Sequence, residues 1–343
     1  MLKIHKVKLP LRRLIKTAHE SFEYRRTILL ELSYNGQTLW SEAPAFATNH
    51  YMPETHESVW AHLIKLGPSI RKCVAYHSLD DLCKSLAAYP ILSSCLDMLA
   101  IQIKMVDSNQ LLSDFFDCSS STVSGSAMLG IFKSEADYLA HINSILDQGY
   151  KAIKLKITPE SLPHTLPLLS RALHQFERVS VDANGSFDHA TYKMLEQVPK
   201  SILLEQPVID KDLLLTIIDA FPERVLLDES VRSMSDLVTV NGLNIAGIML
   251  KPVCLGGIRP TFSMIDYCFE HNIPCGVSGY LDSGVGRYFH WLMAQNSKLS
   301  LRPDFVWSDY YFDGDVCLVM PSTVTNCSFP SINRSYFTES KSI

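Results

Sequence analysis

Residues 179–230 read VSVDANGSFDHATYKMLEQVPKSILLEQPVIDKDLLLTIIDAFPERVLLDES, and the pattern of this stretch indicates how the chain folds. Three short apolar runs within it end in Asp182, Glu205 and Asp228. These acids are equally spaced, because 205 − 182 equals 228 − 205, and Lys251 follows at the same interval again. One strand and one helix fill such an interval. The repeat therefore predicts parallel strands whose charged ends lie at one edge of a sheet.

The alternation of strand and helix continues on both sides of this stretch. A helix is predicted over Glu135–Leu146, with Ser134 as its cap and Gly149 at its end. Seven strands with short connections favour a parallel barrel, because the glycine-rich first turn of an open doubly wound sheet is missing. Phe305–Trp307 is the candidate for an eighth strand. The seven predicted strands are Val123–Met128, Ala152–Ile157, Val179–Asp182, Ile202–Glu205, Val225–Asp228, Ile245–Leu250 and Pro274–Val277.

The first third of the chain has a different pattern. Leu2–Pro10 and Thr27–Tyr34 look like strands, and Asn35-Gly36 is a typical hairpin turn toward Gln37–Trp40. Apolar residues then recur every three or four positions, which predicts helices over Ser58–Leu66, Leu79–Ala88 and Ile91–Val106. The sequence thus predicts an α+β domain over residues 1–120, a boundary in the short polar run Cys118–Ser121, a barrel over residues 121–312, and a segment over residues 313–343 that folds back on the first domain.

The overall composition excludes several classes of protein. The 343 residues include 31 basic and 36 acidic side chains, which gives a net charge of −5 without a dense basic run. Binding to nucleic acid or to a membrane surface is therefore not expected. We also expect no signal peptide and no membrane span, because no apolar run approaches ~18 residues. Nine cysteines without a C-x-x-C pair indicate reduced thiols in a cytoplasmic protein. The remaining partners are small molecules and further copies of the chain.

The equal offset places the three acids side by side on the barrel rim where strand ends form an active site. Each acid also has a local explanation: a turn cap for Asp182, a strand end for Glu205 and a helix start for Asp228. Independent turns do not explain one repeated offset, and converging carboxylates repel each other unless a cation neutralises them. Three oxygen ligands with open positions suit Mg²⁺, with Mn²⁺ as the alternative.

Two lysines lie on one face of a predicted strand. Residues 151–157 read KAIKLKI, so Lys154 and Lys156 point to the same side. The segment alone fits an exposed amphipathic strand equally well. Within a series of strands and helices, however, the apolar side meets the helices and both lysines point into the barrel. Two ammonium groups near each other favour loss of a proton from one of them, so Lys156 is a candidate general base with Lys251 across the rim.

Other motifs are less specific. Gly256-Gly257 and Gly284-x-Gly286 fit either phosphate-binding loops or tight turns. Tyr51 lies in a polar and aromatic loop over Phe46–Met52, which is either a surface loop or a cover for a pocket. No H-E-x-x-H or G-x-S-x-G motif is present.

Five motifs together resemble those of the enolase superfamily, in particular its muconate-lactonising subgroup. They are Lys154-Leu155-Lys156, Asp182-Ala183-Asn184, Glu205-Gln206-Pro207, Asp228-Glu229-Ser230 and Lys251-Pro252. The resemblance covers nearly the whole chain, and within the subgroup it is similar to o-succinylbenzoate synthases and N-succinylamino-acid racemases. Dipeptide epimerases carry Asp-x-Asp near the last strand, where this chain has Val306-Trp307-Ser308-Asp309. The family's Gly-Gly-Met-x-Glu is replaced by Ser278-Gly279-Tyr280-Leu281-Asp282.

The resemblance implies a (β/α)₇β barrel of the TIM type, with an α+β capping domain built from the N-terminal region and the C-terminal tail. Asp182, Glu205 and Asp228 would bind Mg²⁺, which holds a small-molecule carboxylate substrate. Lys156 would remove the α-proton to give an enediolate, and Lys154 would support the carboxylate. The expected substrate contacts are Asn184, Ser278, Gly279 and Tyr51.

Three functions share this set of residues. In an o-succinylbenzoate synthase of menaquinone biosynthesis, Lys156 would return its proton to the departing hydroxide while Lys251 stays protonated. In an N-succinylamino-acid racemase or a related epimerase, Lys251 would instead protonate the opposite face. The third hypothesis is a non-catalytic barrel that retains a metal site.

Overall fold

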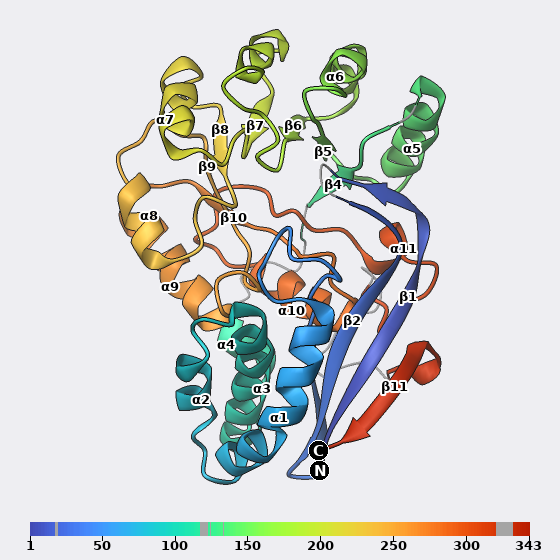
Figure 1. Ribbon diagram of the computed structural model, residues 1–343, viewed down its shortest axis with the longest axis vertical. Coiled ribbons are helices and arrows are strands. Elements are labelled where there is room, and N and C mark those ends of the chain that lie inside the picture. The colour runs from blue at the N-terminus through green and yellow to red at the C-terminus, as the bar shows by residue number, and fades with distance from the viewer. Residues whose placement is uncertain (18–19, 117–122, 124, 133, 320–331) are drawn as a thin grey trace.

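The computed structural model describes residues 1–17, 20–116, 123, 125–132, 134–319 and 332–343. Two sheets organise them (Figure 1): an antiparallel sheet in the order β11-β1-β2-β3, and a parallel sheet in the order β10-β9-β8-β7-β6-β5-β4. The parallel sheet curls and carries helices on its outer side, while the antiparallel sheet and a helical group lie below it and cap it. The boundary predicted at Cys118–Ser121 lies outside the described residues.

The antiparallel sheet is built around a long hairpin. Its strands are β1 (Leu2–Lys16), β2 (Ser21–Tyr34), β3 (Gln37–Ala43) and β11 (Phe337–Ser342). The predicted turn between β2 and β3 is confirmed, since Asn35 and Gly36 both have positive φ, at 46° and 78°. β1 and β2 extend beyond the predicted strands, to Lys16 and from Ser21. β11 pairs antiparallel with β1, so the two ends of the chain lie side by side (Figure 1).

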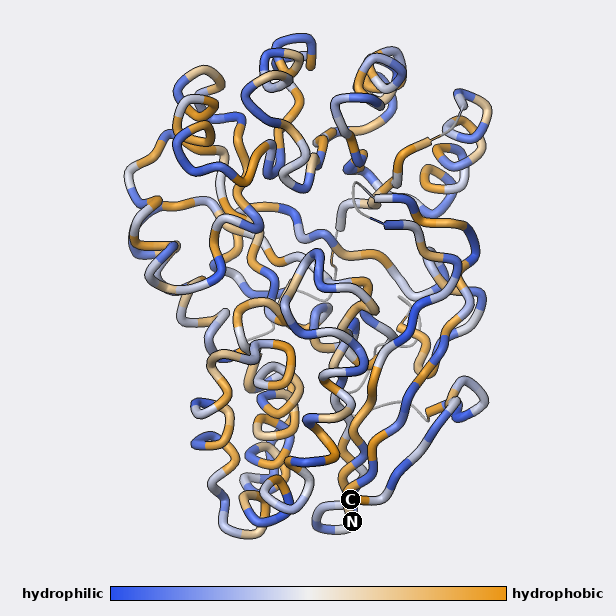
Figure 2. The backbone as a smooth tube through the Cα atoms, in the orientation of Figure 1, coloured by the Kyte–Doolittle hydropathy of each residue, from blue (hydrophilic) through white to orange (hydrophobic). Residues whose placement is uncertain are grey.

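Four helices accompany this sheet: α1 (His56–Ala75), α2 (Leu79–Ser85), α3 (Pro90–Ser108) and α4 (Leu112–Phe116). α1 and α3 pack on the sheet, while α2 and α4 pack mainly against α3. α3 is buried on nearly all sides and stands out as a mostly hydrophobic segment in Figure 2. Its Leu96 joins Leu30, Leu39 and Leu63 in one buried apolar cluster that links helices and sheet. Glu54 accepts hydrogen bonds from the first backbone N–H groups of α3, from Ile91 at 2.8 Å and Leu92 at 3.0 Å.

The seven predicted barrel strands are all present, with ends shifted by a few residues. They are β4 (Ser126–Leu129), β5 (Ala152–Lys156), β6 (Arg178–Asp182), β7 (Leu203–Glu205), β8 (Val225–Leu227), β9 (Gly247–Leu250) and β10 (Cys275–Val277). Helices or helical turns follow them: α5 (Glu135–Asp147), α6 (Leu162–Gln175), the 3₁₀ turn η1 (Tyr192–Gln197), α7 (Lys211–Ala220), α8 (Met234–Val240), α9 (Ile258–Glu270) and α10 (Gly284–Met293). Two short elements, α11 (Ser308–Tyr311) and η2 (Arg334–Tyr336), precede β11.

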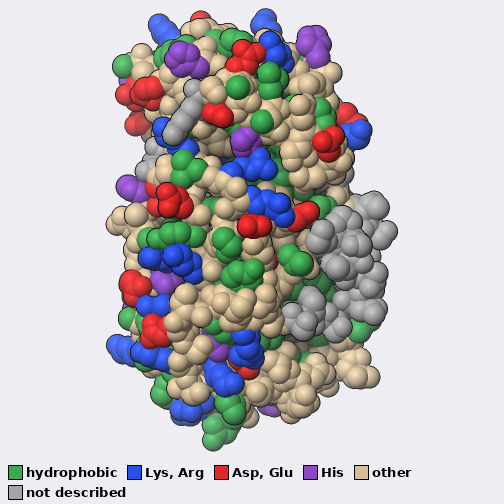
Figure 3. Space-filling model, turned by 90° about the vertical axis from the view of Figure 1, so that its right-hand side faces the viewer, with side chains coloured by type: hydrophobic (Ala, Val, Ile, Leu, Met, Phe, Trp, Pro, Cys, Tyr) green, Lys and Arg blue, Asp and Glu red, His purple; other side chains and the backbone are tan. Residues whose placement is uncertain are grey.

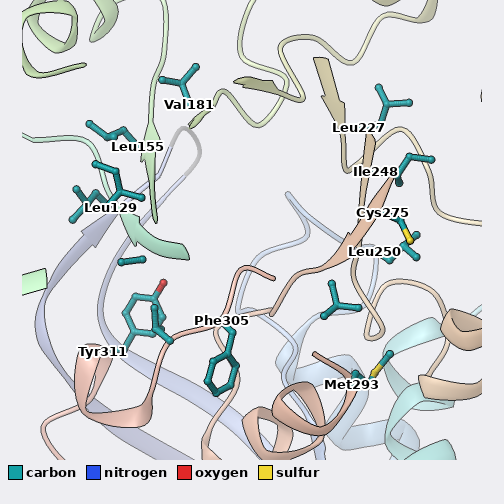
Figure 4. Close-up of a cluster of buried hydrophobic side chains, with 14 of the residues drawn as sticks. Leu129, Leu155, Val181, Leu227, Ile248, Leu250, Cys275, Met293, Phe305 and Tyr311 are labelled. Atoms are coloured by element: carbon teal, nitrogen blue, oxygen red, sulfur yellow. The ribbon is translucent and has the colours of Figure 1, made fainter. Parts of the chain in front are cut away.

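Local signals position these elements as the sequence indicated. Ser134 caps α5 by accepting a hydrogen bond from the Asp137 N–H at 3.2 Å, and Gly149 follows with a φ of 79°. The apolar residues of the strands pack with those of the surrounding helices in one large cluster. Figure 4 shows part of it, with Leu155, Val181 and Leu227 from three strands.

The prediction of an eighth strand over Phe305–Trp307 is wrong. The edges of the curled sheet are joined instead by two residues: Ser126 N–H donates to the Pro303 carbonyl, and Asp304 N–H donates to Val277, each at 2.9 Å. The backbone beyond them bonds to side chains, which removes it from strand pairing. The Val306 carbonyl accepts from the Arg287 guanidinium at 2.6 Å, and the Trp307 N–H donates to the Tyr150 hydroxyl at 3.0 Å.

Two carboxylates of the capping region hold the barrel through helix N-termini. Asp97 of α3 accepts hydrogen bonds from the Ile258 and Arg259 N–H groups at the start of α9, at 2.7 and 3.1 Å. Glu42 of β3 accepts from the N–H groups of Ser283 and Gly286 at the start of α10, at 2.9 and 2.7 Å. A carboxylate is favourable there because it meets unpaired N–H groups and the positive end of the helix dipole.

These contacts decide between the two interpretations of the glycine-rich segments. A Cβ on Gly257 would lie 2.6 Å from an Asp97 carboxylate oxygen, and a Cβ on Gly286 would lie 2.8 Å from one of Glu42. Glycine thus allows the chain's own carboxylates to approach the helix starts. Phosphate binding is not supported at either segment, because a carboxyl group of the chain already occupies the position of the phosphate.

Two further features are the distribution of charge on the surface and the length and polarity of the helices. On the face shown in Figure 3, basic and acidic side chains are interspersed over the described surface. Within the described part of the chain, the helices are too short or too polar to cross a bilayer.

We predict that Glu42→Gln destabilises the protein by about 2 kcal/mol, because an amide nitrogen replaces one acceptor of buried hydrogen bonds. Thr27 and Ser283 hydroxyls also donate to this carboxylate, at 2.8 and 2.7 Å. Urea unfolding measures the loss, with Glu57→Gln as the control because the Glu57 side chain is 73% exposed. Equal stability of the two variants would contradict the anchoring role.

The contribution of Glu42 to stability depends on pH, and its pKa gives the direction of this dependence. Burial, together with the nearby Asp282 carboxylate, raises the pKa of Glu42 from 4.5 to about 7. Between these values the folded protein holds a proton that the unfolded chain has lost, so the contribution to stability falls as the pH rises through about 7. In urea unfolding between about pH 5 and pH 8, wild type should lose more stability than Glu42→Gln. Parallel curves for the two proteins would refute this assignment.

Candidate active site

The three acids of the repeat meet at the carboxyl ends of adjacent strands. Asp182 ends β6 and Glu205 ends β7, and the two are direct partners in the sheet register. Asp228 follows β8. One oxygen from each carboxylate lies within 4.8 Å of the others, and all three residues are buried. The equal spacing of the acids therefore predicted a real convergence of charge.

Three lysines contact these carboxylates. Lys154 donates to Glu205 at 2.6 Å, and Lys156 donates to Asp182 at 2.6 Å. Lys251 donates to Asp228. Lys154 and Lys156 are 2% and 7% exposed, which rules out the solvent-facing amphipathic strand. Because buried charge is costly without a partner, each ammonium and carboxylate stabilises the other.

Burial and pairing with lysines have opposite effects on the pKa values of the carboxylates. Burial, with the nearby Glu229 carboxylate, raises the pKa of Asp228 to about 6. Burial also raises the pKa of Glu205 well above its ordinary range, despite the attraction of Lys154. For Asp182 burial acts in the same direction, but the neighbouring ammonium groups outweigh it and lower the pKa.

The carboxylates also act on the lysines. Burial alone would lower the pKa of Lys154, but the carboxylates of Asp304 and Glu205 raise it well above its ordinary value. The pKa of Lys251 is likewise raised, since the carboxylates of Asp228 and Glu229 together outweigh the effect of burial. For these two lysines, attraction to the acids therefore raises the pKa more than repulsion between lysines, which the sequence suggested, lowers it.

The residues after the acids fix their orientation. Asn184 adopts a left-handed φ of 44°, and its N–H donates to Asp182 at 2.9 Å. Its side-chain oxygen accepts from Lys156 at 2.6 Å, while its amide group donates to Glu229 at 3.1 Å. Gln206 is also left-handed, at 36°, and its side-chain oxygen accepts from the Asp228 N–H at 2.9 Å. The amides of Asn184 and Gln206 therefore connect the strand ends to each other.

The donor set fits a divalent cation. Three buried carboxylates from three neighbouring strands offer oxygen ligands, which are the ligands that Mg²⁺ and Mn²⁺ prefer. The set is open rather than closed, since three protein ligands leave positions for substrate or water. A bound cation would also offset the mutual repulsion that contributes to the raised pKa values of Glu205 and Asp228.

A cavity of about 810 Å³, with its open mouth included, lies beside these groups. Lys154, Lys156, Lys251 and Asp182 line it, and so do all four residues predicted to contact substrate: Asn184, Ser278, Gly279 and Tyr51. Much of the remaining wall is apolar or aromatic. That part comprises Ile15, Phe22, Phe46, Met128, Tyr280, Leu281, Val306 and Tyr311. The structure thus places one charged region and one apolar region in the same cavity.

Asp304 is a charged residue of the site that the sequence analysis missed. Its carboxylate contacts Lys154 and accepts a hydrogen bond from the Ser278 hydroxyl at 3.2 Å. Its backbone joins the sheet edges, so Asp304 occupies the place expected of the eighth strand. The available signal is an acid directly after Pro303, but the residues that follow it, Phe305–Trp307, are more apolar and fit a buried strand better.

Comparison with known proteins agrees with this arrangement. The sequence pattern described as enolase C-terminal domain-like matches residues 137–326, more than half of the chain. The chain therefore belongs to the enolase superfamily, whose enzymes use Mg²⁺ and act on small carboxylate substrates. This confirms the resemblance found in the five motifs.

Among curated relatives, an o-succinylbenzoate synthase from Bacillus subtilis is 24% identical over 348 residues, covering 96% of this chain and 91% of the relative. An N-succinylamino acid racemase from Amycolatopsis is 22% identical over 323 residues, covering 91% and 87%. An o-succinylbenzoate synthase from Listeria innocua is 28% identical over 195 residues, or 55% of this chain. That match spans about half (48%) of the Listeria protein.

The same fold is found in solved structures. An enolase superfamily member from Listeria innocua superposes with a TM-score of 0.85 and 18% identity, covering 99% of this chain and 97% of that protein. At this identity the match establishes the fold, a curled parallel barrel with an antiparallel capping sheet. The fold expected from the sequence is thereby confirmed.

We predict that the protein binds one equivalent of Mg²⁺ or Mn²⁺ and that Asp182→Asn, Glu205→Gln and Asp228→Asn each weaken this binding at least tenfold. Each variant removes one negative oxygen ligand. Calorimetry with Mg²⁺ and the electron paramagnetic resonance signal of Mn²⁺ measure the affinity. Asp219→Asn, on the exposed side of α7, is the control. Unchanged affinity in all three variants would place the metal elsewhere.

Proposed function

We propose that the protein is an o-succinylbenzoate synthase that requires Mg²⁺. It would dehydrate 2-succinyl-6-hydroxy-2,4-cyclohexadiene-1-carboxylate to 2-succinylbenzoate in menaquinone biosynthesis. The observation that carries the proposal is the convergence of three carboxylates and three lysines at the strand ends, beside a cavity that Asp182 and all three lysines line. The names of the Bacillus and Listeria relatives support this reaction among those of the superfamily.

Asp182, Glu205 and Asp228 are the residues that would hold the ion. When bound, Mg²⁺ supplies positive charge that neutralises a substrate carboxylate and the negative charge that develops as the α-proton leaves. The surrounding wall excludes water from this charge, because much of the cavity is apolar.

Lys156 is the proposed base. Its amine nitrogen takes the α-proton and returns it to the departing hydroxide, so that water leaves and the ring becomes aromatic. Asp182 and Asn184 orient this nitrogen through contacts of 2.6 Å each. Lys154, held between Glu205 and Asp304, supplies a second positive charge near the substrate carboxylate. Lys251 remains protonated and stabilises the anion from the other side.

The second candidate is an N-succinylamino-acid racemase. It is favoured by the position of Lys251. This lysine follows β9 and Lys156 ends β5, so three strands, β6 to β8, separate them, and yet both line the same cavity. Two lysines on different sides of one substrate carbon permit proton removal on one face and proton delivery on the other. The Amycolatopsis relative bears this name.

The proposed setting is the cytoplasm. The seven cysteines among the described residues are free, and six of them are buried. Buried free thiols of this kind are typical of a reducing compartment.

Purified protein with Mg²⁺ should dehydrate the cyclohexadiene substrate, and Lys156→Ala and Lys251→Ala should each lower kcat at least a thousandfold, because the first removes the base and the second the positive charge that stabilises the anion. Formation of 2-succinylbenzoate is followed by absorbance. Lys151→Ala is the matched control, since Lys151 immediately precedes the same strand but is exposed.

Three outcomes distinguish the hypotheses. Dehydration that survives EDTA would contradict a metal-dependent synthase. Deuterium exchange at the α-carbon of both enantiomers of an N-succinylamino acid, with negligible dehydration, would establish the racemase instead. Absence of α-proton exchange with every acid tested, together with intact Mg²⁺ binding, would establish a non-catalytic metal-binding barrel.

A further inference from the structure

Arg25 of β2 joins the capping region to a barrel loop through backbone carbonyls. Its Nε donates to the Leu281 carbonyl at 2.9 Å, and a terminal nitrogen donates to Tyr280 at 3.3 Å. On the capping side, the guanidinium donates to the carbonyls of Ala45, at 3.3 Å, and Pro44. One planar group therefore bonds to two loops that are widely separated in the sequence.

The surroundings of Arg25 are unusual for a charged residue. It is 2% exposed, and no ion pair to it is found among the described residues. Its guanidinium lies 4.2 Å from the centre of the Phe46 ring. The carboxylates of Glu42 and Asp282 act on it electrostatically without a direct ion pair, so its hydrogen bonds to carbonyls and its contact with the ring also offset the cost of burying its charge. Such an arrangement holds the two loops at one fixed distance.

Both loops contribute the apolar wall of the candidate active site. Phe46, Tyr280 and Leu281 line the cavity, and the rings of Phe46 and Tyr280 lie 4.8 Å apart. Leu281 adopts a left-handed φ of 54°, which is strained for a residue with a large side chain. The carbonyl of this strained residue is the one that Arg25 Nε binds. A second arginine, Arg287, binds the next carbonyl, that of Asp282, at 2.8 Å.

We propose that Arg25 is a positioning residue that sets the apolar wall of Phe46, Tyr280 and Leu281, and thereby the affinity for the part of the substrate remote from the reacting carbon. The charged groups at the strand ends lie on other elements and do not depend on Arg25 for their contacts. Loss of Arg25 should therefore weaken binding of the part of the substrate remote from the reacting carbon more than binding of the carboxylate next to that carbon. The choice of ligands below rests on the proposed synthase function.

The first experiment tests positioning without any ligand. Arg25→Lys keeps the charge, but a single ammonium cannot span both loops. Amide hydrogen exchange of this variant should be at least tenfold faster in peptides covering residues 44–46 and 279–282, with α3 unchanged. Arg26→Lys is the control, because Arg26 is exposed on the same strand and bonds to Tyr24. Exchange that accelerates throughout the protein, or in neither loop, would overturn the proposal.

The second experiment compares two ligands on the Mg²⁺-loaded protein by calorimetry and by competition. Arg25→Lys should weaken binding of 2-succinylbenzoate at least tenfold and change the affinity for benzoate, which lacks the succinyl group, less than twofold. Equal weakening of both ligands would indicate a general structural role and overturn the proposal. If wild type does not bind 2-succinylbenzoate, the synthase function fails, and hydrogen exchange still decides the role of Arg25.

A further variant keeps the test decisive if Arg25→Lys does not fold. Leu281→Ala shortens one side chain of the wall and leaves the hydrogen bonds of Arg25 to backbone carbonyls in place. It should reproduce the selective loss of 2-succinylbenzoate affinity while exchange at residues 44–46 stays as in wild type. Unchanged affinity would show that the wall does not contact the ligand, contrary to the proposal.

Discussion

Charge that is buried only in matched pairs is the constraint on which the barrel depends. Three carboxylates within 4.8 Å of one another would drive the strand ends apart if lysines from neighbouring strands did not contact them. This pairing requires one sheet register, in which Lys156 is opposite Asp182 and Asp182 is opposite Glu205. A slip of one residue in β5 would turn both of its lysines toward the helices and leave the acids without partners. The register that folds the barrel is therefore the register that assembles the site.

Buried charge also attaches the capping region, but here backbone N–H groups compensate it. Glu42 and Asp97 are buried acids, and each accepts hydrogen bonds from backbone N–H groups at the start of a barrel helix. Backbone donors at a helix start are rigid, so these contacts fix the orientation of the cap rather than merely attaching it. The glycines at both positions are explained by the close approach of the carboxylates. A fixed cap is what allows its loops to form part of the cavity wall.

The sequence predicted the parts that follow from local pattern and period. Strand ends, the equal spacing of the acids and the alternation that puts Lys154 and Lys156 on one face were sufficient to place the charged rim. It did not predict partners that only the folded chain brings together, such as Glu42 with Ser283, 241 residues away. The closing strand was misplaced because side chains, not a neighbouring strand, satisfy the backbone after Asp304. Local sequence does not distinguish Arg25 from its neighbour Arg26, because only the fold buries one and exposes the other.

The site divides into two parts with different origins. The groups suited to proton transfer come from strand ends, where the register tolerates little change. Part of the apolar wall comes from the Tyr280–Leu281 loop, whose carbonyls are held by arginines rather than by strand pairing. Loops can vary in sequence without disturbing the register, so substrate preference can change while the charged rim stays the same. This division explains why relatives named as synthases and as racemases both resemble this chain over most of its length. The motifs that identify the superfamily therefore fit one shared proton chemistry, and our proposal assigns the choice of substrate to the loops joined by Arg25.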